Sequence, residues 1–331
     1  MSILFITNRI HDVIVSGTGV ITTDPTLFFS DHVSYGIQTS GSSTAAINSI
    51  DVYHKETSTD TTWIHAVVAF DVSHFGNNAD GTIMFRCFDS ADNAIFEFDL
   101  RDGLARISVF GTSQVNFTIS GQVANGIPGP TTFDVKIVMG ANITVTVYRD
   151  GGTVPIAEAT AAANGQGSPA REQWRCFDWT NAGSNFIQTI SEIIIADEDT
   201  RGLFMTDKFT MAAGELEQWD GDVADIADEL VTTLISTTKI NQKFTRAIAA
   251  YTGPDSALVR GLFSTVYCNF VTAGDIRMIA TKDEEKYFTG KFGVVSAQKP
   301  FTVGFENNPI ASTPWNTSEF TGFEIGIEST F

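Results

Sequence analysis

Segments with the composition of β-strands follow one another through the first 200 residues, and this succession most constrains the fold. Residues 63–72 are rich in β-branched and aromatic side chains, which favour strands. Residues 142–149 alternate, so Ile143, Val145 and Val147 share one face of a predicted strand. Short strands between turn signals are typical of sandwiches. We therefore predict an all-β chain whose first domain is an antiparallel sandwich.

Turn signals separate these strands. The polar cluster at residues 89–93 predicts a hairpin between strands at 82–88 and 94–100. Residues 153–172 are rich in Ala, Gly and Asn, so we expect a loop there, followed by the last strands of the domain at 173–179 and 191–196.

The pattern changes near residues 200–220, where charged residues follow the last of these strands. Apolar side chains in residues 220–229 recur at helical spacing, which is the one helical signal in the chain. Strand patterns then resume between residues 244 and 327. We predict two domains: residues 1–200, with residues 1–25 serving as an assembly arm, and a second, smaller β sandwich over residues 201–331.

The composition limits the classes of partner that the chain can bind. The chain has 331 residues, 43% of them apolar, and a formal net charge of −19. Such a surface repels phosphate backbones and anionic membranes, so we expect neither nucleic acid nor membrane insertion. We find no apolar stretch near the ~20 residues that span a bilayer and no signal peptide, so synthesis in a cytoplasm is expected.

The three cysteines, Cys87, Cys176 and Cys268, form neither a disulfide framework nor a zinc pattern. Cys87 and Cys176 each lie in an Arg-Cys-Phe-Asp sequence. The two thiols could face each other across two sheets, but we favour the alternative that both are free and buried. His65 alternates with apolar neighbours, which indicates a packed or edge position rather than a metal ligand.

Residues 63–72, 133–137 and 144–151 together resemble the strand order of concanavalin A-like, laminin-G-like jelly rolls. The resemblance covers residues 30–196. It implies a jelly-roll fold for the first domain and no particular ligand.

The segment at residues 191–202 ends in Asp-Thr-Arg-Gly and resembles recurring structural proteins of bacteriophages. Similar stretches lie at residues 212–214, 218–221, 308–309, 314–315 and 322–328. The resemblance implies a virion component, with other virion proteins and further copies of the chain as partners.

Glu97 and Asp99 lie two residues apart on one predicted strand and therefore share a face. Jelly-roll glycanases that resemble this fold place a further carboxylate two or three residues later, because retaining hydrolysis needs two carboxylates about 5 Å apart. Here those positions hold Arg101, which cannot donate a proton near neutral pH, and Asp102, which precedes Gly103 in a predicted turn. We expect no enzymatic activity.

Three clusters of oxygen ligands would suit Ca²⁺, but none matches a defined calcium loop. We therefore expect turn and solvation roles, predict no cofactor and assign no metal site. The clusters are Asp89 with Asp92 and Asn93, Asp197 with Glu198 and Asp199, and Asp220 with Asp222 and Asp225.

Trp179, Trp219 and Trp315 lie beside turn-rich stretches and are the candidate ligand-binding residues. An exposed aromatic ring can stack on a pyranose face, whereas core packing is the alternative that we favour for each ring.

These observations predict a non-enzymatic bacteriophage virion protein, associated with the tail fibre, tip or adhesion apparatus. It would act through subunit contacts as a homo-oligomer, with a host surface glycan as a further expected partner. A capsid decoration or head-fibre protein and a stand-alone carbohydrate-binding lectin are the alternatives, and a glycan hydrolase is a third class.

Overall fold

The structure is a computed structural model of the chain. It describes residues 3–7, 14–16, 21–23, 37–41, 48–57, 59–70, 82–101, 104–112, 115–119, 131–176, 186–205, 209–221, 235–248, 259–268, 274–294, 299–320 and 322–330. Within these residues the chain forms two compact units, Met1–Met205 and Thr206–Phe331. The division falls five residues beyond the boundary expected at residue 200.

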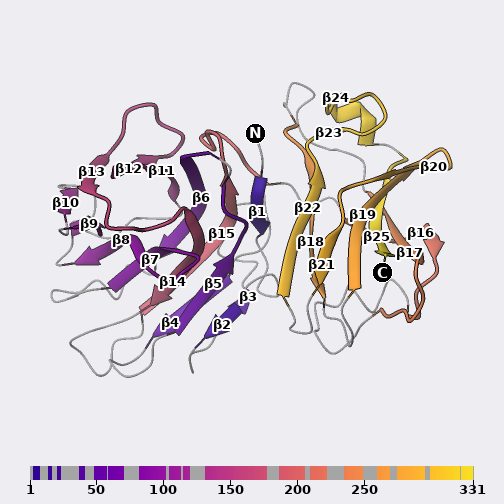
Figure 1. The fold of residues 1–331 in the computed structure, drawn as a ribbon, viewed down its shortest axis with the longest axis horizontal. Coiled ribbons are helices and arrows are strands. Elements are labelled where there is room, and N and C mark those ends of the chain that lie inside the picture. Colours follow the sequence, from indigo (N-terminus) through magenta and orange to yellow (C-terminus); the bar gives the residue numbers. More distant parts are fainter. Residues whose placement is uncertain are drawn as a thin grey trace. The chain divides into compact units, whose positions relative to one another are not determined.

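One sheet of the first unit is eight-stranded and antiparallel (Figure 1). Its order is β13 (Ala157–Ala162), β12 (Asn142–Arg149), β11 (Thr131–Val138), β6 (Thr61–Phe70), β15 (Phe186–Ala196), β4 (Ile37–Gly41) and β3 (Ile21–Thr23), and β1 (Ile3–Thr7) also pairs with β15.

The other sheet is seven-stranded and also antiparallel. Its order is β10 (Val115–Ile119), β9 (Leu104–Val109), β8 (Ala94–Arg101), β7 (Thr82–Asp89), β14 (Pro169–Cys176), β5 (Asn48–Tyr53) and β2 (Ile14–Ser16).

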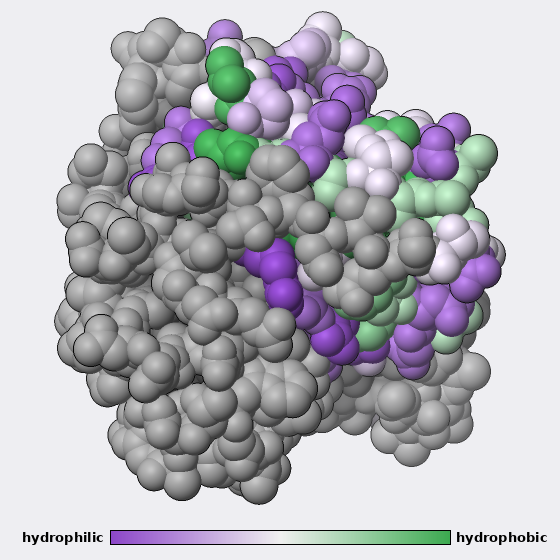
Figure 2. Space-filling view, turned by 90° about the vertical axis from the view of Figure 1, so that its left-hand side faces the viewer, coloured by the Kyte–Doolittle hydropathy of each residue, from purple (hydrophilic) through white to green (hydrophobic). Residues whose placement is uncertain are grey.

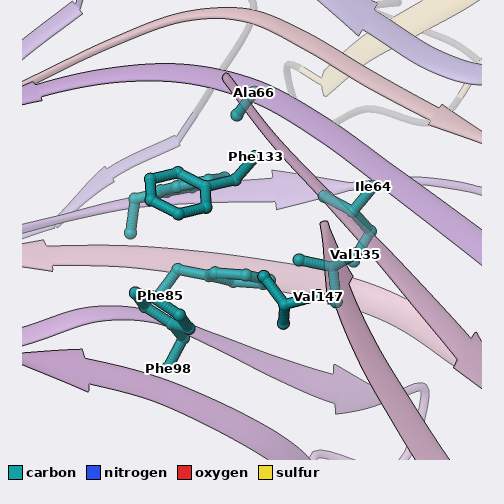
Figure 3. A pocket seen from close by; sticks show the side chains of 8 residues that line it. Ile64, Ala66, Phe85, Phe98, Phe133, Val135 and Val147 are labelled. Atoms are coloured by element: carbon teal, nitrogen blue, oxygen red, sulfur yellow. The ribbon is translucent and has the colours of Figure 1, made fainter. Parts of the chain in front are cut away.

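The two sheets share one core. Ile64, Phe133 and Val147 of the eight-stranded sheet line the same interior space as Phe85 and Trp174 of the seven-stranded sheet (Figure 3). The alternation in the sequence explains this arrangement, because every second residue of a strand points to the same face. The predicted antiparallel sandwich and the hairpin at residues 89–93 are confirmed.

Two expectations for the first unit were wrong. Residues 153–172 contain β13 and the start of β14, because alternating alanines, buried at Ala157, Ala159 and Ala161, suffice for a half-buried strand. The small side chains alone predict a loop, but burial of every second alanine stabilises a strand. The strands described within residues 1–25 pair with β15, β5 and β4 of their own unit, so they form no free arm.

The second unit is built on a six-stranded antiparallel sheet. Its order is β16 (Phe209–Glu217), β17 (Lys243–Ile248), β25 (Glu324–Thr330), β19 (Gly274–Lys282) and β20 (Glu285–Phe288), with β21 (Phe292–Val294) also paired to β19. Two further pairs are β18 (Leu262–Cys268) with β22 (Lys299–Phe305) and β23 (Asn307–Asn308) with β24 (Thr313–Pro314). A short 3-10 helix, η3, spans Thr317–Phe320.

The closing segment that carries the resemblance, residues 322–328, leads into β25 in the interior of this sheet. Phe323 is 1% exposed. Gly326 allows the close approach of β17, because a Cβ atom there would lie 1.8 Å from the Phe244 carbonyl oxygen. The predicted helical segment at residues 220–229 falls almost entirely outside the described residues. No helix among the described residues is long and apolar enough to cross a membrane.

Candidate functional site

The structure describes two of the three candidate tryptophans, and these two differ in burial. Trp179 lies outside the described residues. Trp315 is 3% exposed, stacks on Phe320 with ring centroids 5.0 Å apart and donates its indole N–H to the Phe305 carbonyl at 2.8 Å. A buried ring offers no face to a sugar, so Trp315 is a core residue and the ligand-binding expectation for it is corrected.

Trp219 is half-buried and follows β16 at a bend. Its indole Nε1 donates to the Gln242 carbonyl at 3.0 Å. The next residue, Asp220, forms a β-bridge with Ser236, and Gln218 exchanges hydrogen bonds with the backbone of Lys243. The ring is thus held on one edge while part of its surface reaches solvent.

The exposed surroundings of Trp219 are polar. Glu217, Gln218 and Asp220 are exposed beside it, and Ile240 is 52% exposed on the turn that precedes Gln242. A rigid aromatic surface with neighbouring carboxylate and amide groups can stack on a sugar ring and bond its hydroxyls.

Glu97 is engaged in an ion pair. It lies opposite Arg86 in the β7–β8 register, and both Nε and Nη2 of Arg86 donate to its Oε2. The expected neighbour, Arg101, and the candidate partner carboxylate, Asp99, have side chains outside the described part. The carboxylate oxygen that faces Arg86 is thus occupied by two hydrogen bonds from the protein.

A second arginine cluster lies on the seven-stranded sheet. Arg171 donates to Asp51 at 2.7 Å and to Asp92 at 2.8 Å, while its guanidinium lies 3.9 Å from the centroid of the Phe88 ring. Gln173 also donates to Asp51, at 2.9 Å. These carboxylates are already occupied by protein donors.

The turn after β7 is organised by Asp89. Its carboxylate accepts hydrogen bonds from the backbone N–H groups of Ala91, Asn93 and Gly167 and from the Asn93 amide. Burial alone would raise the pKa of Asp89, but these hydrogen bonds lower it below its usual value. Asp89 therefore has a turn role, as expected. No group of three His, Cys, Asp or Glu residues able to hold a metal occurs among the described residues.

His65 lies in a buried polar cluster. Its Nδ1 is 2.8 Å from Asp134 Oδ1, which also accepts a hydrogen bond from Thr200 Oγ1 at 2.8 Å. The three residues are at most 1% exposed, and Asp134 Oδ2 and His65 Nε2 have no hydrogen-bond partner. The packed position expected for His65 is confirmed. Asp134 gave no signal beyond a polar residue in an apolar strand, and Thr200 lies after the end of β15.

Sequence reasoning missed a second buried cluster. His54 Nε2 is 2.9 Å from Glu172 Oε1, and the Cys87 thiol lies 3.8 Å from the same oxygen. Burial alone would lower the pKa of His54, but the Glu172 carboxylate raises it above its usual value. Burial raises the pKa of the Cys87 thiol well above its usual value. A buried, protonated thiol is unreactive.

Cys87 is free and buried, as expected. The arrangement across two sheets is wrong, because Cys87 in β7 and Cys176 in β14 belong to neighbouring strands of one sheet. The sequence positions 54, 87 and 172 gave no sign of the cluster because strand pairing alone brings them together.

The sandwich interior contains a cavity of about 10 Å³, lined only by apolar side chains in Figure 3. Ligand pockets are usually 300–1,000 Å³ in volume, roughly. This space is a packing defect and offers no substrate site. On the face drawn in Figure 2, hydrophilic and hydrophobic residues are interspersed over the described surface.

No family model matches the sequence, and none of the curated proteins compared with it is similar. Solved structures resemble the fold at low identity. A glucuronan lyase from the fungus Trichoderma reesei is 6% identical with a TM-score of 0.44, and the match covers 57% of this chain and 91% of that one. The binding domain of botulinum neurotoxin serotype C1 is 12% identical with a TM-score of 0.42, covering 87% and 62% respectively. The globular domain of T. cruzi calreticulin is 10% identical with a TM-score of 0.42, covering 60% and 89%.

Proposed function

We propose that this chain is a bacteriophage virion protein of the tail or adhesion apparatus that works by surface contact and binds a glycan through Trp219. The observation that carries the glycan contact is the half-buried Trp219 ring, fixed by its hydrogen bond to the Gln242 carbonyl. A ring that is already immobilised loses little conformational freedom on binding, which favours stacking on a sugar.

The ion pairs support a contact role over catalysis. Glu97 is bound to Arg86, and Asp51 to Arg171, so these carboxylates are neutralised by protein partners. Glycoside hydrolysis needs one carboxyl group that is protonated and another that is free to react.

The virion assignment is supported by the resemblance of residues 191–202 and 322–328 to phage structural proteins. A tail position is our choice because sandwiches of the jelly-roll type often hold glycans or neighbouring subunits. A capsid decoration or head-fibre position is the alternative.

Glycan binding is tested with fragments of host surface polysaccharide, titrated against the intact chain and followed by saturation-transfer NMR. Trp219→Ala should abolish the signal, Trp219→Phe should retain part of it, and Ile310→Ser, at an exposed apolar position between β23 and β24, should leave it unchanged. Equal binding by the Trp219→Ala variant and the wild type would exclude this residue as the platform.

The virion assignment has its own test. Mass spectrometry of purified particles should detect the chain, and electron cryo-microscopy with a labelled copy should place it at the tail. A label on the capsid would establish the alternative position, and absence from purified particles would refute the virion assignment.

A further inference from the structure

Residues 197–205 form a segment that we call the strap. It follows β15, which ends at Ala196, and none of its residues belongs to a strand. It turns sharply at residues 200–203, where the Leu203 N–H donates to the Thr200 carbonyl at 2.9 Å. Gly202 has φ of +76°, the conformation that the third position of such a turn requires and that glycine adopts without strain.

The strap is held to the eight-stranded sheet and to the turn after β12, where Arg201 Nη1 donates to the Gly152 carbonyl at 3.4 Å. The Thr200 hydroxyl donates to Asp134 on β11. The Arg201 guanidinium lies 4.5 Å from the Tyr148 ring centroid on β12 and 5.5 Å from that of Trp63 on β6.

A further contact lies at the end of the strap. The Met205 N–H donates at 3.0 Å to the Glu192 carboxylate, and Glu192 itself adopts φ of +50° at a register shift in β15. The register shift in β15 therefore lies at Glu192, whose carboxylate binds Met205, the last residue of the first unit.

The strap differs from the strands in how it is held. It contributes no residue to the buried apolar cluster of the first unit, and Phe204 is 43% exposed. Segments with few apolar contacts and no ladder hydrogen bonds open locally at a lower free energy than the core does.

We propose that residues 197–205 are a releasable strap that sets how much chain connects the two units. Closed, the strap belongs to the first unit and the connection begins after Met205. Open, it lengthens the connection by the strap's own residues, each of which reaches roughly 3.3–3.6 Å when extended, while the sandwich stays folded. Thr200, Arg201 and Glu192 are the positioning residues for the closed state, and the inference does not depend on the proposed glycan.

Hydrogen exchange of the intact chain tests the proposal at the amides of Arg201, Leu203 and Met205, each of which donates a hydrogen bond in the closed strap. Thr200→Val should accelerate their exchange about tenfold, the effect of losing one hydrogen bond to a charged group. Amides in β6 and β11 should keep their wild-type rates.

Matched variants separate opening from general destabilisation. Thr200→Ser retains the hydroxyl and should behave as the wild type, and Thr160→Val removes a hydroxyl from β13 and should leave the strap unchanged. Arg201→Gln removes the ring contacts, the ion pair with Asp199 and the hydrogen bond to the Gly152 carbonyl, keeps the Thr200 hydroxyl that bonds Asp134, and should also accelerate Leu203 and Met205. Unchanged strap exchange in both Thr200→Val and Arg201→Gln, or equal acceleration in β6 and β11, would overturn the proposal.

Trypsin gives an independent measurement because Arg201 lies within the strap. In Thr200→Val, cleavage after Arg201 should accelerate, and the fragment that ends there should keep its β-sheet circular dichroism. Cleavage at the wild-type rate, or a fragment that unfolds, would show that the strap does not open as an independent segment.

Discussion

Both units pair buried carboxylates with arginine, as Arg86 does with Glu97 in the first unit, but among the described residues only the first unit also uses histidine. In the first unit, His54 pairs with Glu172 and His65 with Asp134. In the second unit, Glu328 pairs with Lys243 and Arg277. All five histidines of the chain lie within residues 11–74, so only the first unit can respond through histidine in the neutral pH range.

The units also differ in their cores. Among the described residues the first unit buries one large apolar cluster between two sheets, whereas the cluster of the second unit is small and dominated by Trp315, Phe320 and Phe323. Removing one of these three rings leaves a cavity that the surrounding structure fills only in part.

The largest expected effect follows from this difference. Trp315→Ala should destabilise the second unit by about 3–5 kcal/mol, the usual cost of removing a buried aromatic side chain. Chemical denaturation should show a lower midpoint for one transition and an unchanged midpoint for the other. Trp219→Ala is the matched control, because its ring is only half-buried, and a comparable loss in that variant would contradict the core assignment of Trp315.

The ion pairs of the second unit give the next effect. Glu328→Gln leaves Lys243 and Arg277 without their carboxylate and should cost about 1.5–3 kcal/mol, the range for hydrogen bonds to charged groups. Burial alone would raise the pKa of Glu328, but Arg277 and Lys243 lower it below its usual value. The stabilisation is therefore present above a pH of about 4.5 and is lost as the pH falls through the lowered pKa.

A pH profile measures both parts of this expectation. Wild-type protein should lose stability in the second unit as the pH falls toward 3, whereas Glu328→Gln should lose less over the same range. Parallel profiles for the two proteins would show that Glu328 does not carry the acid response.

The first unit should respond at the opposite end of the pH scale. The pKa of His54 is raised in the folded chain, so its pairing with Glu172 stabilises fully below a pH of about 6.5 and is lost as the pH rises through the raised pKa. Denaturation between about pH 6 and pH 9 should show a falling midpoint for the first unit alone. His54→Gln should make the midpoint of the first unit less dependent on pH. An equal fall in the midpoints of both units would contradict the assignment of the response to histidine in the first unit.

The sequence predicts the strands of the fold better than it predicts the buried clusters of polar residues. Alternating residues such as Val145 and Val147 indicate a strand and its buried face because the period of a strand is two. The pairing of His54 with Glu172 spans 118 positions and depends on strand order, which local patterns do not encode. The Asp-Thr-Arg-Gly sequence carries the resemblance, but its turn and its contact with Asp134 depend on the folding of β11 beside it.

The smallest expected effect concerns Glu97, which pairs with one cation where Glu328 pairs with two. Glu97→Gln removes the ion pair with Arg86 and should cost about 1.5 kcal/mol, the lower end of the range for hydrogen bonds to charged groups. The substitution keeps the shape of the side chain and one acceptor oxygen for Arg86. Because no catalysis is expected, incubation of wild-type and variant chains with host polysaccharide should leave the polymer intact in both cases. Degradation by the wild type that Glu97→Gln abolished, with the fold retained, would show that the guanidinium does not hold this carboxylate inactive and would make the first unit an enzyme.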